Sequence, residues 1–68
     1  MSNVIISTEP RLTESERAEL RDRISRDGEV KVCARIGIAR NTVGRLVAGL
    51  TTRATTAVAT RVYLAQAL

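Results

Sequence analysis

The chain has 68 residues, which is enough for one domain with a small hydrophobic core and too few for two. It has one cysteine and no histidine, so an internal disulfide is excluded and the usual ligand set of a zinc site is absent. Its one aromatic residue is a tyrosine, which argues against single-stranded nucleic-acid binders and RNA-recognition sheets, because these stack bases on aromatic side chains.

Charge is divided unevenly along the chain. Residues 1–29 hold all seven acids against five arginines, a net charge of −2, whereas residues 30–68 hold six basic residues and no acid. These six are Lys31, Arg35, Arg40, Arg45, Arg53 and Arg61. An acid-free basic block attracts phosphate or anionic lipid, and arginine suits bidentate contacts with phosphate and guanine, although high-GC coding would produce the same arginine bias. We therefore expect a polyanionic partner, and duplex DNA in particular.

Residues 1–12 are predicted to form an extended N-terminal arm, with a β-prone run at Val4–Ile6 and a stop at Pro10. The run is too short for a signal peptide or a membrane span, so we expect a cytoplasmic protein without a membrane partner. The arm has two possible roles: it pairs with the same arm of a second chain, or it covers the core of its own domain.

A first helix is predicted from Glu14 to the residue before Gly28. Thr13 and Glu16 have the spacing of a capping box, and acids in the first turns are favoured by the helix dipole. Leu20 and Ile24 lie one turn apart and are expected to face the core, with the acids on the solvated face.

The next segment is predicted to be a two-turn helix over 30–36 that stops at Gly37, with a strand as the competing interpretation because of its valines. After a turn of about three residues, a third helix places four apolar residues on its core face, namely Val43, Leu46, Val47 and Leu50, and ends at Gly49. Its other face carries Asn41, Gly44, Arg45 and Ala48.

"LTTR" is predicted to be a loop, followed by a last helix that starts at residue 55 or 56. This helix is expected to bury Val58, Val62 and Ala65, with Leu64 and Leu68 beside them. Tyr63 is expected to be partly exposed or to form a dimer contact. The predicted fold is thus all-α, about four helices over residues 13–68 behind the short arm.

Residues 29–48 resemble the helix-turn-helix of phage repressors, Cro proteins and lactose-repressor headpieces. The resemblance rests on apolar residues at the spacing of the shared core, a small Cys33 and a turn glycine, Gly37; the apolar residues are Val32, Ile36, Ile38, Val43 and Leu46. The following stretch, residues 46–68, is similar to the loop and next helix of phage repressors. Two residues depart from the family pattern. Ala39 stands where a Ser or Thr cap is usual, and Glu29 would repel a phosphate.

The resemblance implies that the second helix of the motif enters the major groove of DNA. Base contacts are then expected from Ala39, Arg40, Asn41, Gly44 and Arg45. Phosphate contacts are expected from Lys31, Arg35, Thr42, Thr51, Thr52 and Arg53. Arg45 is the preferred partner of guanine and Asn41 that of adenine. Gly44 lies on the same face, where a missing side chain would let the backbone approach the DNA.

These observations predict a DNA-binding transcriptional repressor of phage or mobile-element type. We expect a homodimer on a pseudo-palindromic operator, joined through Val4–Ile6 or through the C-terminal helix. An enzyme is not expected, nor is a metal, a cofactor or a small-molecule ligand, because no catalytic constellation or phosphate loop is present. Two alternatives remain: an antitoxin that also represses its own operon, and a helical protein-interaction module that docks its basic half on an acidic partner.

Overall fold

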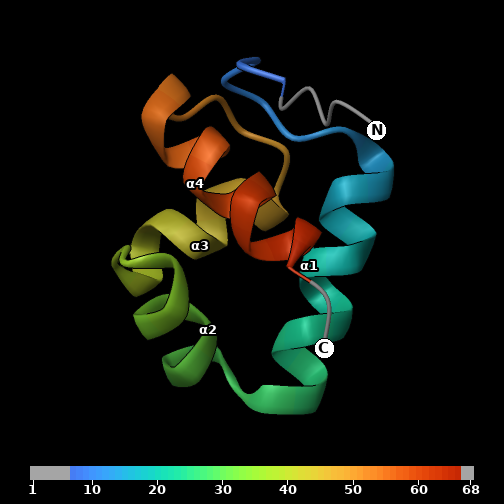
Figure 1. Cartoon of the computed structure of the whole chain (residues 1–68), viewed down its shortest axis with the longest axis vertical. Helices are drawn as coiled ribbons and strands as arrows, with labels where there is room; N and C mark the ends of the chain where they lie inside the picture. The colour runs from blue at the N-terminus through green and yellow to red at the C-terminus, as the bar shows by residue number, and fades with distance from the viewer. Residues whose placement is uncertain (1–6, 67–68) are drawn as a thin grey trace.

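The computed structural model describes residues 7–66, which form four helices (Figure 1). They are α1 (Glu14–Asp27), α2 (Glu29–Ile36), α3 (Arg40–Val47) and α4 (Ala54–Ala65). Within 7–66 there is no strand, which confirms the all-α prediction, and no helix long and apolar enough to cross a membrane. The predicted β-prone run Val4–Ile6 and the predicted core residue Leu68 lie outside the described residues.

The start of α1 is the capping box that the sequence predicts. The Glu16 amide donates to Thr13 Oγ1 over 3.1 Å, and the Thr13 amide donates to Glu16 Oε1 over 2.9 Å. These two bonds satisfy backbone groups that a helix end otherwise leaves without partners, so the position of this end follows from local sequence. The helix ends at Asp27, directly before Gly28, also as predicted.

A three-residue turn, residues 37–39, joins α2 to α3. Gly37 has φ +85° and ψ 35°, the left-handed conformation that glycine adopts without strain. The amides of Gly37 and Ile38 both donate to the Cys33 carbonyl, over 2.8 and 3.1 Å. The chain therefore leaves α2 abruptly, and the helical interpretation of this segment is confirmed over the strand.

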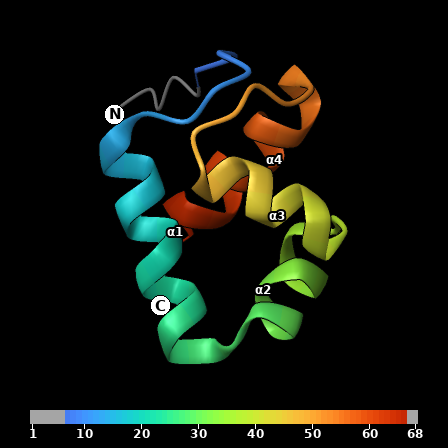
Figure 2. The same cartoon turned by 180° about the vertical axis from the view of Figure 1, so that it is seen from behind.

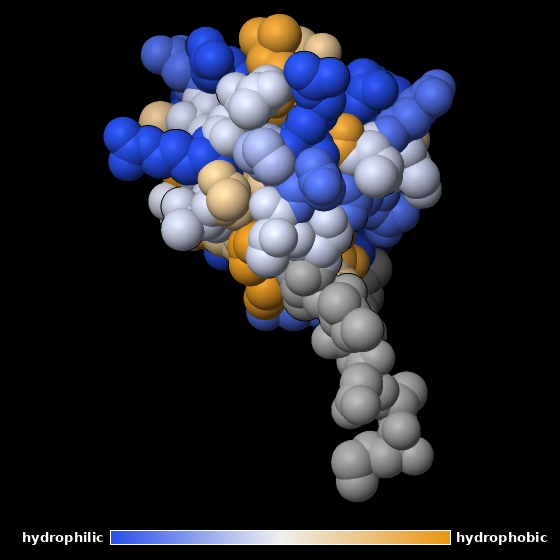
Figure 3. All heavy atoms as spheres, turned by 90° about the horizontal axis from the view of Figure 1, so that it is seen from above, coloured by the Kyte–Doolittle hydropathy of each residue, from blue (hydrophilic) through white to orange (hydrophobic). Residues whose placement is uncertain are grey.

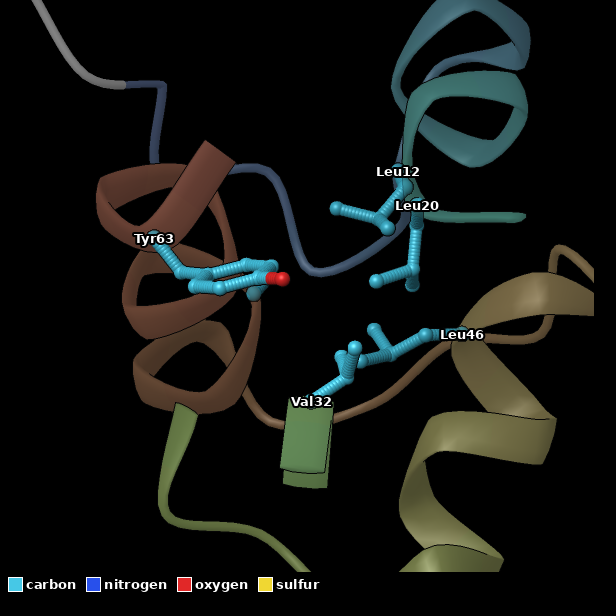
Figure 4. Close-up of a cluster of buried hydrophobic side chains, with 6 residues drawn as sticks. Leu12, Leu20, Val32, Leu46 and Tyr63 are labelled. Atoms are coloured by element: carbon cyan, nitrogen blue, oxygen red, sulfur yellow. The ribbon is translucent and has the colours of Figure 1, made fainter. Parts of the chain in front are cut away.

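One core joins all the elements (Figure 4). Each contributes a buried side chain, in chain order Leu12, Leu20, Val32, Leu46 and Tyr63. The predicted core residues Ile36 and Ile38 pack against this cluster and are partly buried, as is Ile24. Because the N-terminal segment supplies Leu12, residues 7–12 belong to the packed domain rather than to a free arm.

The buried face of α4 differs from the predicted one. Ala57, Thr60, Arg61 and Tyr63 are buried, whereas Val62 is 43% exposed, Ala65 is exposed and Val58 is only partly buried. The prediction failed because α4 has small or apolar residues on every face, so hydrophobic periodicity does not select one. The large Tyr63 ring, which is 6% exposed and lies 5.3 Å from the guanidinium carbon of Arg23, turns inward instead.

The end of α3 corrects a second prediction. The helix stops at Val47, and Leu50, predicted to continue its core face, lies beyond it with 49% of its surface exposed. Gly49 causes this break: its φ is +79°, and a Cβ atom there would lie 2.9 Å from Nη1 of Arg17. A side chain at this position would be strained by the positive φ and would displace the end of the Arg17 side chain.

A buried arginine ties the N-terminal segment to α1 and α4. The Arg61 side chain is 4% exposed, and its Nε donates to Glu16 Oε2 over 2.9 Å. Its remaining nitrogens donate to three carbonyls, those of Ser7, Glu9 and Arg11. Arg61 is therefore no part of the exposed basic surface to which the sequence assigned it, because its charge is neutralised in the interior.

Glu16 is the carboxylate partner of that arginine. Partial burial alone raises the pKa of its carboxyl, but hydrogen bonds from Arg61 and from the Thr13 backbone outweigh burial and lower the pKa below its ordinary value of 4.5. A carboxyl with a lowered pKa stabilises the fold above its unfolded pKa. This contribution is present above about pH 4.5 and is lost as the pH falls through the lower, folded value.

We expect Glu16→Gln to lower the free energy of unfolding at pH 7 by about 1 to 3 kcal/mol, because the glutamine oxygen still accepts from Arg61 but leaves its buried charge uncompensated. Urea denaturation from pH 7 to pH 3 measures the difference, which should shrink below pH 4.5. Glu14→Gln, an exposed change in the same turn, is the control and should cost only about 0.5 kcal/mol. A difference in unfolding free energy that does not depend on pH would contradict the role of the Glu16 carboxylate as the charge partner of Arg61.

Candidate functional site

The outer face of α3 presents the residues that the sequence predicts as base contacts. Ala39, Arg40, Asn41, Gly44 and Arg45 are all exposed. Val43 and Leu46, on the opposite face, are 1% and 0% exposed and hold the helix on the core. Residues three and four positions apart share a face of a helix, so Asn41, Gly44 and Arg45 form one continuous surface.

Gly44 leaves the middle of this surface open. A Cβ atom built there would have no neighbouring atom within 4 Å, so no packing contact requires glycine at this position. Its backbone is ordinary right-handed helix, since its φ is not positive. The glycine therefore has no structural explanation within the domain, although it weakens the helix relative to alanine.

Arg40 already has a partner within the chain. Its Nε donates to Glu29 Oε1 over 2.6 Å, and this hydrogen bond raises the pKa of the Arg40 guanidinium. The pair is exposed and joins the first residue of α2 to the first residue of α3. Glu29 engages only Nε of Arg40 and offsets its charge, whereas Arg45 makes no salt bridge among the described residues.

A polar hollow lies beside the Arg45 end of this face. It is lined by Thr42, Arg45, Thr51, Thr52, Arg53 and Thr56. The structure thus brings together one predicted base contact and four predicted phosphate contacts from α3 and the loop 48–53. Hydroxyl groups and guanidinium groups without a carboxylate form a lining suited to an anion.

Two threonines in the lining differ from the prediction. Thr56, in the first turn of α4, was not predicted as a site residue, because the sequence assigned this helix to the core or to a contact between copies. Thr52 lines the hollow, but its amide and its hydroxyl both donate to the Pro10 carbonyl over 3.1 Å. A phosphate contact through the Thr52 hydroxyl would break one of these bonds, so Thr52 holds the loop in place.

Lys31 and Arg35 are exposed on α2 and do not line the hollow. They are one turn apart on the same side of the helix. Arg61 is buried and Arg40 is paired with Glu29. Four exposed cations of the basic half then make no salt bridge in the described part of the chain: Lys31, Arg35, Arg45 and Arg53. The basic surface is thus smaller than the sequence indicates and is centred on α2, α3 and the loop.

The loop 48–53 and the N-terminal segment lie side by side at one end of the molecule (Figures 1 and 2). Seen from above, this end is mostly hydrophilic, with hydrophobic residues in separate patches (Figure 3). No group of His, Cys, Asp and Glu in residues 7–66 could hold a metal ion, and Cys33, the one cysteine, is buried and free.

Comparisons with protein-family models, with curated proteins and with solved structures find no match for this chain. The fold and the surface just described are therefore the basis for any functional conclusion. They define a small four-helix domain whose third helix has an exposed face that continues into a polar hollow without a carboxylate in its lining.

Proposed function

We propose that this protein is a sequence-specific DNA-binding regulator, a repressor of the phage type, in which α2 and α3 act as a helix-turn-helix. In this proposal α3 enters the major groove, Asn41 and Arg45 contact base edges, and the hollow accepts the phosphate backbone beside the groove. The observation that carries the proposal is the continuity between the exposed face of α3 and the hollow, because Arg45 belongs to both.

The charge arrangement supports this proposal. Residues 30–68 contain no acid. The acid nearest to α3 in the sequence, Glu29, forms a salt bridge with Arg40. The hollow, which has guanidinium and hydroxyl donors and no carboxylate in its lining, is suited to attract a phosphate at long range and to bind it at short range. A helical module for an acidic protein partner would use the same charges, but it would not need base-reading side chains such as Asn41.

We infer further that two copies bind one pseudo-palindromic site. The exposed part of α4 supports a contact between copies, because Thr55, Val62 and Ala65 are exposed there and none of them is charged. In contrast, exposed residues of α1 include charged pairs such as Arg26 with Asp22. The stoichiometry of the complex with DNA tests this part of the proposal.

DNA titrations at several salt concentrations test the proposed function. We expect the full chain to select a common sequence from a random pool of duplexes and to bind it as two copies in the presence of competitor DNA. The logarithm of the association constant should fall linearly with the logarithm of the salt concentration, by about 0.9 for each phosphate neutralised. No binding at low salt and micromolar protein would reject DNA as the partner and leave the protein-interaction module.

Arg45 and Arg53 are expected to behave differently, although both line the hollow. Arg45→Ala should cost about 1 to 3 kcal/mol of binding free energy on the selected sequence and relax discrimination at one base pair. Arg53→Ala should weaken binding to all sequences alike and reduce the salt dependence by about one phosphate. Competition among single-base variants of the selected sequence measures both effects, and equal losses on every sequence for both variants would contradict the role of Arg45.

Gly44→Ala separates the stability of the fold from binding to DNA. Because a Cβ atom at residue 44 meets nothing within 4 Å, the substitution should stabilise the domain by up to about 1 kcal/mol, measured by urea denaturation. If the backbone of α3 approaches the bases closely, the same variant should bind the selected sequence more weakly. Ala48→Gly, which lies on the same face one turn later, is the matched control. Unchanged affinity for Gly44→Ala would show that the open position has no role in binding.

A further inference from the structure

One arginine of the N-terminal segment contacts a residue that lines the hollow, although the sequence assigns this arginine to the acidic half of the chain. Arg11 is exposed, and its Nη2 donates to Thr51 Oγ1 over 3.3 Å. Thr51 lines the hollow together with Arg45 and Arg53. Three guanidinium groups from three different parts of the chain therefore gather around Thr51 and its neighbours.

The position of Arg11 is set by its backbone as well as by its side chain. The Arg11 carbonyl accepts a hydrogen bond from Nη2 of the buried Arg61 over 3.0 Å. The preceding carbonyl, that of Pro10, accepts from both the amide and the hydroxyl of Thr52. These bonds hold the segment against the loop 48–53, so the backbone at Arg11 is already ordered before a ligand binds at this site.

We propose that Arg11 is a phosphate contact for duplex DNA and extends the interface from α3 and the loop onto the N-terminal segment. This inference rests on the proposed function and adds a residue that neither the sequence pattern nor the helix-turn-helix resemblance includes. The chemistry is that of a guanidinium on a phosphate oxygen, with Thr51 as its neighbour and no carboxylate in the lining of the hollow. Arg61 and Thr52 are positioning residues for Arg11.

The test is a salt titration of the full chain with a fluorescein-labelled duplex of mixed sequence. Arg11→Gln should make the negative slope of log association constant against log salt shallower by about 0.9, the value for one phosphate contact on B-form DNA. Arg11→Lys should keep the slope of the unchanged chain, because it keeps the charge. Arg26→Gln is the matched control. It removes the same charge from an exposed arginine in the last turn of α1, the end of that helix farther along the chain from Arg11, and the salt dependence of this variant should equal that of the unchanged chain.

The outcomes separate this inference from the function on which it rests. If the unchanged chain does not bind the duplex, the proposed function fails and Arg11 has no phosphate to contact. If the unchanged chain binds and Arg11→Gln has the same slope, the role of Arg11 alone is overturned. An equal fall for Arg26→Gln also overturns it, because the effect would then follow net charge rather than position. Thermal unfolding of each variant establishes that a shallower salt dependence does not come from partial unfolding.

Discussion

The buried guanidinium of Arg61 is the interaction on which the rest of the structure depends. Removing such a charge from water is costly unless its nitrogens have partners, and here Glu16 and three backbone carbonyls accept hydrogen bonds from all three guanidinium nitrogens. These partners belong to α1 and the N-terminal segment, while Arg61 belongs to α4. The same bonds therefore fix which face of α4 is buried, bring Leu12 into the core and place Arg11 beside the loop.

Internal ion pairs also decide where charge is exposed. Glu16 neutralises Arg61 in the interior, and Glu29 neutralises Arg40 between two helix starts. On α1, Arg23 and Arg26 pair with acids one turn earlier in the same helix. Seven cations make no salt bridge in the described residues. Three of them, Arg11, Arg17 and Arg21, belong to the acid-rich first part of the chain, whereas Lys31, Arg35, Arg45 and Arg53 lie on α2, α3 and the loop, where the sequence has no acid after Glu29. The α2, α3 and loop side of the domain is therefore its basic side.

The third helix is short and weak by its own sequence. It has eight residues, no side chain caps its start, and an interior glycine lowers its propensity. Val43 and Leu46 hold the helix by packing against the core. Its stability therefore comes from the buried face, and Asn41, Gly44 and Arg45 on the outer face are not needed for packing. A helix of this kind can present polar side chains at the surface without loss of its own position, which is what the proposed DNA-reading role requires.

Local sequence determined the helix ends. The capping box at Thr13 and the left-handed Gly37 act within a few residues, and the apolar spacing around Val32 and Leu46 identified two buried faces. Tertiary structure alone decided the rest: the burial of Tyr63 and Arg61, and the contact of Arg11 with Thr51 beside the hollow. These features depend on pairings across about 40 to 50 residues, such as Arg61 with Glu16, which leave no periodic or spacing signal in the chain.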